Sequence, residues 1–172
     1  MLSKTRKKGS QLRHSTSACA GGRAKPELSD DYIVGLVDGE GCFYVSISES
    51  ARYRAGARVL LSLHIKMQAR DREVLNRVAQ TIGCGSVYFQ KESRPNHTQC
   101  YRYTVGSHND ILTIIVPFFK RHPLQTPSKS YNFDIFCKIA QIVKNNEHLN
   151  KQGINRIKQL KQQMNQRTSG LA

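Results

Sequence analysis

Apolar residues beyond position 28 recur with two spacings, one typical of amphipathic helices and one typical of half-buried strands. Ser29 is a favourable helix N-cap, and Asp30 and Asp31 follow it in the first turn, where negative charge suits the helix dipole. Apolar and polar side chains alternate along 58–67, as in a strand with one buried face. The predicted elements are, in chain order, a helix from Ser29 to the glycines at 39 and 41, strands over 42–49 and 58–67, a helix over 71–82, strands over about 86–91 and 99–105, and helices over about 107–119, 129–145 and 151–165.

The order helix-strand-strand-helix-strand-strand-helix, followed by C-terminal helices, predicts an α+β domain with a four-stranded antiparallel sheet. Helices can cover one face of such a sheet and leave the other open. A two-stranded ribbon fits the major groove of DNA, and polar side chains on it can bond to base edges. An ordinary solvated sheet face would show the same alternation, so both interpretations stay open. The polar residues expected on the open face are Ser46, Ser48, Ser62, His64, Lys66, Gln90, Gln99 and Arg102.

Positive charge decides which partners such a face suits. Lys and Arg number 27 against 12 Asp and Glu, a formal net charge of +15. This excess attracts polyanions, namely DNA, RNA or an anionic membrane surface. No apolar run approaches the roughly 20 residues of a membrane-spanning helix, which argues against a membrane partner. A structural role like that of a ribosomal protein would also produce this charge.

The chain is expected to divide into a basic tail over 1–27, a folded domain over 28–145, and a C-terminal helix with a short tail over 146–172. The basic tail has no acid before Glu27 and few large apolar residues, so it is predicted to be disordered. It could serve as a phosphate-binding arm or as an organelle transit peptide. The 5 cysteines include no C-x-x-C pair, which argues against a zinc ribbon and a disulfide framework and indicates a reducing compartment rather than secretion.

The segment from Ile33 to Gly41, IVGLVDGEG, combines two small residues with two acids at the end of an apolar helix. It resembles the nine-residue signature of the LAGLIDADG homing endonucleases. The turn IGCGSV that begins at Ile82, the order of elements, and the C-terminal run that begins NEHL are also similar to that family, so the resemblance covers residues 28–165. It implies an enzyme that binds a long, roughly palindromic site on double-stranded DNA as a homodimer. It also implies cuts across the minor groove that leave short 3′ overhangs.

Phosphodiester hydrolysis needs an activated water and stabilisation of negative charge, which Mg²⁺ (or Mn²⁺) supplies when hard oxygen ligands hold it. The resemblance implies that Glu40 is the metal ligand, although many relatives have Asp there, and the carbonyl of Gly39 is a second candidate ligand. It also implies a supporting catalytic role for Lys129 and for a polar residue at the end of the second strand. Direct register places that residue on Met67, and its neighbour Gln68 is chosen instead.

One metal-binding carboxylate per chain is few for cutting two strands, so two chains are expected to meet at the motif helix. Gly35 supports this, because glycine in a helix interior costs about 0.5–1 kcal/mol relative to alanine, a loss that close helix approach would offset. The alternative is that Gly35 packs against the chain's own core. The predicted dimer interface comprises Ile33, Gly35, Leu36, Asp38 and Gly39. The residues predicted to bind DNA are Ser46, Ser48, Arg52, Arg54, Arg58, Ser62, His64, Lys66, Gln90, Arg94, Gln99 and Arg102.

Two other functions stay open at this point. One is an RNA maturase that assists intron splicing and takes intron RNA as its partner. The other is a non-cutting DNA-binding protein on the same fold. The presence of Glu40 favours a nuclease, because neither alternative needs that acid. An intron-encoded protein of this kind is expected in an organelle (chloroplast or mitochondrion) or in the bacterial cytoplasm.

Overall fold

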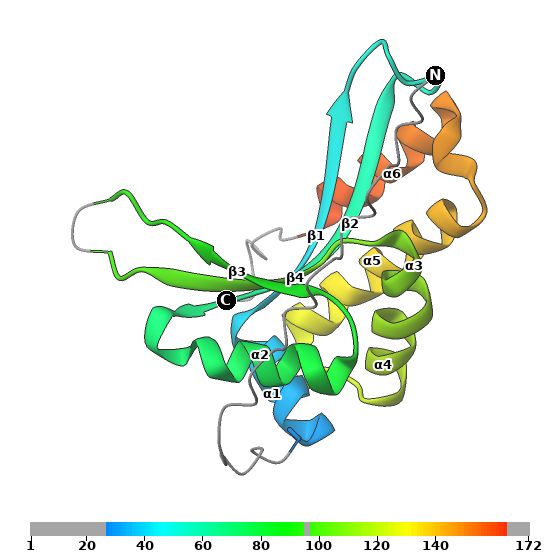
Figure 1. Ribbon diagram of the computed structural model, residues 1–172. Coiled ribbons are helices and arrows are strands. Elements are labelled where there is room, and N and C mark those ends of the chain that lie inside the picture. The colour runs from blue at the N-terminus through cyan, green and yellow to red at the C-terminus, as the bar shows by residue number, and fades with distance from the viewer. Residues whose placement is uncertain (1–26, 95–96, 165–172) are drawn as a thin grey trace, which may run out of the picture.

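The computed structural model describes residues 27–94 and 97–164. They form a four-stranded antiparallel sheet in the order β1-β2-β4-β3, and the helices gather on one side of it (Figure 1). The α+β architecture predicted from the sequence is therefore confirmed. The basic tail lies, except for its last residue, outside the described residues. The elements are α1 (Asp30–Glu40), β1 (Gly41–Glu49), β2 (Ala57–Gln68), η1 (Ala69–Asp71), α2 (Arg72–Ile82), β3 (Ser86–Gln90), β4 (Cys100–Val105), α3 (His108–Asp110), η2 (Ile111–Ile115), α4 (Val116–Arg121), α5 (Pro127–Lys144), η3 (Glu147–Leu149) and α6 (Lys151–Gln163).

Helix α1 begins after its predicted N-cap, Ser29, and continues through Gly39, the first of the two glycines that were expected to end it. The side chain of Ser29 accepts a hydrogen bond of 3.2 Å from the backbone N–H three residues on. Gly39 is still helical, and the last helical residue is Glu40. Gly41 forms the C-cap, where a Cβ atom would lie 2.6 Å from the side chain of Val37. The chain can therefore pass directly from helix into strand only with glycine at this position.

Strand register places all even-numbered strand residues on one face of the sheet and all odd-numbered ones on the other. Cys42 of β1 lies opposite His64 of β2, and Lys66 of β2 lies opposite Arg102 of β4. Tyr88 of β3 also pairs with Arg102. Because directly paired residues share a face, the predicted polar positions of all four strands become one continuous surface. We call this surface, made by the even-numbered residues of β1 to β4, the open face.

The opposite face packs against the helices and forms the hydrophobic core. Phe43 of β1 lies at its centre, with ring centroids 5.5 Å from Phe119, 4.9 Å from Phe133 and 5.3 Å from Phe136. These aromatic contacts join β1 to α4 and α5. Ile157 of α6 is completely buried in the same core, so the C-terminal helix packs on the rest of the fold.

Two helices depart in detail from the sequence pattern. The helix predicted over 107–119 contains a π-helical segment, Ile111–Ile115, between α3 and α4. Helix α5 begins at Pro127, two residues before the predicted start, because proline is well suited to the first turn of a helix. Among the described residues, no helix combines the length and apolar character needed to cross a membrane.

Candidate active site and nucleic-acid interface

Helix α1 buries one face in its own chain and leaves the other uncovered. Val34 and Val37 are buried in the core. Gly35 and Gly39 are exposed on the uncovered side, and Tyr32 keeps 46% of its surface accessible. A Cβ atom added at either glycine would meet no atom within 4 Å. Packing against the chain's own core therefore does not explain Gly35, and the glycine-bearing face is open to a partner.

One predicted interface residue is corrected by this arrangement. Ile33 has no accessible surface, because it points into the chain's own core. Its side chain therefore cannot contact a partner. Leu36 and Asp38 are partly buried, and both oxygens of Asp38 already accept hydrogen bonds within the chain, from Gln125 and Thr126.

Glu40 lies at the end of α1 with its carboxylate exposed. In the described part of the chain, no side chain or backbone group forms a hydrogen bond or ion pair with this carboxylate. Glu40 lines two shallow hollows. One, of about 340 Å³, it shares with Lys66, Gln68 and Arg70. The other, of about 380 Å³, it shares with Cys42, Tyr44, His64, Lys66 and Arg102. The carboxylate of Glu40 therefore lies without an ion-pair partner at the edge of a surface that carries Lys66, Arg70 and Arg102.

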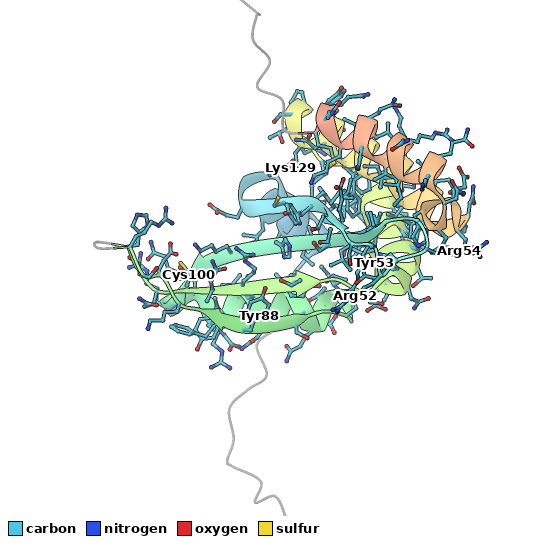
Figure 2. The ribbon with its side chains drawn as sticks, turned by 90° about the horizontal axis from the view of Figure 1, so that it is seen from above. Arg52, Tyr53, Arg54, Tyr88, Cys100 and Lys129 are labelled. Atoms are coloured by element: carbon cyan, nitrogen blue, oxygen red, sulfur yellow. The ribbon has the colours of Figure 1, made fainter. Side chains whose placement is uncertain are left out.

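Both predicted supporting residues lie close to the end of α1. The ammonium of Lys129, in the first turn of α5, donates a hydrogen bond to the carbonyl of Gly41, the residue after Glu40 (Figure 2 shows Lys129 beside α1). Gln68 is exposed at the end of β2 and lines the same hollow as Glu40. Met67 also lines this hollow, but it is partly buried and packs against the core. Strand parity thus places Gln68, and not its neighbour, on the face that carries the acid.

The predicted metal site can be tested against the donors that the fold brings together. Within the described residues, no three side chains of His, Cys, Asp or Glu lie close enough to hold a metal ion. A cation at Glu40 would therefore take most of its ligands from backbone oxygens, water or substrate. Mg²⁺ fits such a sparse, all-oxygen site, because it retains several water ligands and binds through one or two carboxylates plus phosphates.

The open face carries most of the residues predicted to contact DNA. Ser46, Ser48, Arg58, His64, Lys66, Gln90 and Arg102 all have the parity of this face. Arg52 and Arg54 are exposed in the turn that joins β1 to β2, at one end of the sheet (Figure 2). Nε of Arg102 and Oε1 of Gln90 are buried and find no hydrogen-bond partner within the part of the chain that the structure describes. Such unsatisfied polar atoms are rare in folded proteins.

A hydrogen-bond network at the centre of the open face corrects the role expected for Ser62. The imidazole of His64 bonds to the hydroxyl of Ser62 at 2.9 Å and to the hydroxyl of Thr104 at 2.9 Å, and Tyr88 bonds to Thr104 at 3.1 Å. Ser62 is only 8% exposed, so it orients His64 rather than meeting DNA. Burial, together with the positive charge of Arg102, lowers the pKa of His64, which is therefore neutral at pH 7.

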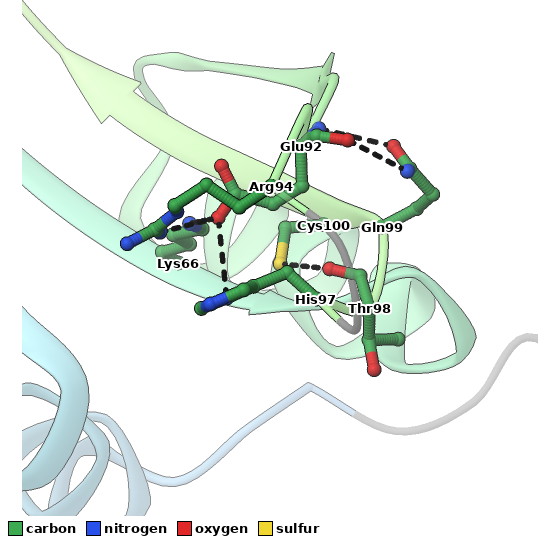
Figure 3. A network of polar contacts seen from close by, with 7 residues as sticks. All are labelled: Lys66, Glu92, Arg94, His97, Thr98, Gln99 and Cys100. Carbon is green, nitrogen blue, oxygen red and sulfur yellow. Dashed lines mark hydrogen bonds and ion pairs between the residues drawn. The ribbon is translucent and has the colours of Figure 1, made fainter.

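A second network, in the connection between β3 and β4, corrects the role expected for Gln99. Its side-chain amide bonds to both the backbone N–H and the carbonyl of Glu92, each at 3.1 Å, and it lies outside β4 (Figure 3). Gln99 therefore closes the loop beside β4 and is not part of the open face, although each end of its amide keeps one further hydrogen-bonding position. The carboxylate of Glu92 pairs with Arg94 at 2.7 Å and with Lys66 at 3.5 Å. The hydrogen bond from Arg94 is the main reason why the pKa of Glu92 is lowered.

Sequence reasoning passed over several open-face residues. Cys42, Tyr44, Tyr88 and Thr104 share the parity of the predicted polar set, and both tyrosines are 45% exposed. The signal was present, because side chains on a strand alternate with a period of two whatever their polarity. Only part of the polar side chains on these strands entered the predicted face, so these four positions were left out of it.

Comparison with known proteins agrees with this geometry. Residues 33–140 match the LAGLIDADG endonuclease family, so the chain belongs to that family. It is 30% identical over 131 residues to probable intron-encoded endonuclease 2 of Neurospora crassa, a match that covers 76% of this chain and 26% of that protein. It is 32% identical over 104 residues to probable intron-encoded DNA endonuclease 1 of Mycosarcoma maydis, covering 60% of this chain and 35% of the relative. The chain thus spans about a quarter to a third of the length of these curated relatives.

Solved homing endonucleases share the fold. The crystal structure of the homing endonuclease I-TnaI superposes with a TM-score of 0.72 at 35% identity, covering 82% of this chain and 90% of that one. I-SmaMI bound to an uncleaved DNA target in the presence of calcium ions superposes with a TM-score of 0.75 at 30% identity, covering 84% of this chain and 47% of that one. The predicted family and fold class are confirmed by these matches.

Proposed function

We propose that this protein is an intron-encoded homing endonuclease that cuts both strands of a long, pseudo-palindromic DNA site with a divalent cation, as a homodimer joined through α1. The observation that carries the proposal is the unpartnered carboxylate of Glu40 at the end of a helix whose glycine-bearing face is uncovered. Two such helices packed face to face place two acids at one location, which suits a two-fold symmetric cut. The fungal intron-encoded relatives favour an organelle as its location.

Glu40 would hold the cation, Mg²⁺ or Mn²⁺, together with the carbonyl of Gly39. The bound cation supplies charge stabilisation and lowers the pKa of a water ligand. The ammonium of Lys129 bonds to the carbonyl of Gly41, the residue that follows Glu40. In this position it can stabilise negative charge on the phosphate. Gln68, which shares the hollow with Glu40, can orient a water by its side-chain amide. Arg70 lines the same hollow and offers a further phosphate contact.

The open face would lie in the major groove. Arg58, Lys66 and Arg102 provide cations for phosphates or guanines, and His64 is held in one orientation by its two hydroxyl partners. Arg52 and Arg54 extend the surface at the tip of the β1–β2 hairpin, where they would contact the outer part of each half-site.

Cleavage accounts for Glu40 better than binding alone does. A carboxylate without a partner at the rim of a basic surface repels phosphates, which weakens the association of a protein that only binds DNA or RNA. A cation between the carboxylate and the phosphate removes this repulsion. A non-cutting DNA-binding protein or an RNA maturase would gain affinity from Gln at position 40.

The test is cleavage of a randomised or genomic DNA library in Mg²⁺ by the wild-type protein and by Glu40→Gln. We expect the wild type to release a defined set of fragments and Glu40→Gln to bind the selected DNA without cutting it. Lys144→Gln, which changes an exposed lysine at the end of α5, is the control and should cut like the wild type. Unchanged cleavage by Glu40→Gln, or wild-type binding without any cleavage, would overturn the proposal.

A further inference from the structure

The cations of the sheet itself are confined to its two central strands. On the open face, Arg58 and Lys66 belong to β2, and Arg102 belongs to β4. The edge strand β1 presents only Cys42, Tyr44, Ser46 and Ser48 on this face, and the single charged residue of the strand is an acid, Glu49. The β1 edge therefore lacks any basic group of its own.

A ribbon in a DNA groove needs cations at its edges more than at its centre. Neighbouring strands lie about 4.8 Å apart, and the major groove is about 12 Å wide. A two- or three-stranded ribbon therefore fills the groove, and the phosphates that form its walls lie beyond the outer strands. Phosphate contacts supply most of the affinity of such complexes. A β1 edge with only neutral and acidic side chains would leave one of these walls without a contact.

Helix α6 lies beside this edge and brings two lysines to it. The ammonium of Lys158 donates a hydrogen bond to the carboxylate of Glu49, across 109 residues of sequence. The ammonium of Lys161, three residues later in α6, lies 6.0 Å from the centre of the Tyr44 ring. Tyr44 is an exposed residue of the open face, so Lys161 reaches the rim of that face from the neighbouring helix.

The contact made by Lys158 also compensates the charge of Glu49, the one acid of β1. Pairing with Lys158 lowers the pKa of Glu49, so the acid stays ionised with its charge compensated. The lysine side chain of this pair remains 41% exposed and can contact a further anion. Ile154 and Ile157 anchor α6 in the core, so the helix holds its lysines at a fixed position rather than on a flexible arm.

We infer that α6 forms a phosphate-contacting wall at the β1 edge, with Lys158 and Lys161 as its contacts to one strand of the DNA backbone. This inference rests on the proposed function, since it takes DNA as the ligand of the open face. It assigns the C-terminal helix a part in binding beyond covering the core. Contacts of this kind bind all sequences nearly equally, so α6 contributes to affinity and position on the duplex rather than to base specificity.

The test measures the affinity for the selected DNA site over a range of salt concentrations. The double variant Lys158→Gln with Lys161→Gln should lose about 1.8 in the slope of log affinity against log salt for each bound chain, from about 0.9 for each lost phosphate contact. The loss should be the same on matched and mismatched sites. The matched control, Lys138→Gln with Lys144→Gln on α5, should keep the wild-type slope. Changing Lys158 and Lys161 to arginine instead of glutamine should also keep the wild-type slope, because the positive charge is retained.

Thermal unfolding of each variant establishes that the change lies in binding and not in folding. A scan with neutral methylphosphonates then locates the contacts. At some phosphate positions the replacement should weaken DNA binding by the wild type but leave binding by the Lys158→Gln, Lys161→Gln variant unchanged. A wild-type slope in this double variant would overturn the role of α6 while the wild type still binds and cuts. A wild type that binds no selected site would instead overturn the proposed function.

Discussion

The carboxylate of Asp38 accepts two hydrogen bonds from Thr126, one from its backbone N–H at 3.3 Å and one from its hydroxyl at 2.9 Å. Thr126 is the N-cap of α5, and its own side chain makes no capping bond. Asp38 therefore ties the segment just before α5 to the end of α1. Lys129 lies in the first turn of α5, so this contact fixes its position beside Gly41.

We predict that Asp38→Ala lowers the free energy of unfolding by about 1.5–3 kcal/mol, because the hydrogen bonds from Gln125 and Thr126 to a charged carboxylate are lost. It should also reduce the cleavage rate, because α5 no longer holds Lys129 at the end of α1. Urea unfolding and single-turnover cleavage measure the two effects. Asp134→Ala, which removes an exposed acid in the middle of α5, should change neither. A cleavage rate that Asp38→Ala leaves intact would contradict the positioning role.

Replacement of Gly35 should separate folding from assembly. Because a Cβ atom at this position meets nothing within 4 Å in the single chain, Gly35→Ala should stabilise the monomer by about 0.5–1 kcal/mol through its helix preference. The same substitution should weaken the dimer, and Gly35→Leu should weaken it further. Sedimentation over a range of protein concentrations follows the dimer, and chemical unfolding of the dilute protein follows the monomer. A dimer that tolerates leucine would show that α1 does not form the interface.

Acid should destabilise the fold through its histidines. The pKa values of His64, His108 and His148 lie below the ordinary value of 6.5, chiefly because burial disfavours the charged ring. Nε2 of His108 and Nδ1 of His148 are buried with no hydrogen-bond partner among the described residues. Below pH 6.5 the unfolded chain therefore binds more protons than the folded one, so stability falls until the pH lies below the folded pKa values.

Thermal unfolding between pH 8 and pH 5 checks this expectation. The Tm should change little from these groups above pH 7 and fall progressively below pH 6.5. The variant His108→Gln should lose less stability over this range than the wild type. An identical pH profile for His108→Gln and the wild type would mean that the buried ring does not control the acid response.

Much of the fold followed from local signals, because caps and strand alternation depend on residues close in sequence. Ser29, the paired strands and the parity of Arg102 are examples. The even or odd position of a residue in a strand identifies the sheet face on which its side chain lies. It does not show whether the polar groups of that side chain already form hydrogen bonds within the chain. Ser62 and Gln99 therefore had the right residue type for DNA contact and were engaged within the chain.

Other features depend on tertiary packing and had no local signal. The burial of Ile33 became clear only from the way α1 lies on the sheet, since both faces of that helix carry apolar residues. Lys158 and Lys161 looked like ordinary basic positions of an amphipathic helix. Their proximity to β1 spans more than 100 residues of sequence, and nothing near either segment encodes it.

The central claim is that two copies of Glu40, one from each chain, act together on both DNA strands. Wild-type and Glu40→Gln chains co-folded in equal amounts should distribute at random among dimers, so about a quarter of the dimers carry two acids. Linearisation of a plasmid with the selected site should therefore fall to about a quarter of the rate given by the same total amount of wild-type protein. A fall to about one half would mean that each chain cuts on its own, and it would contradict the paired-helix site.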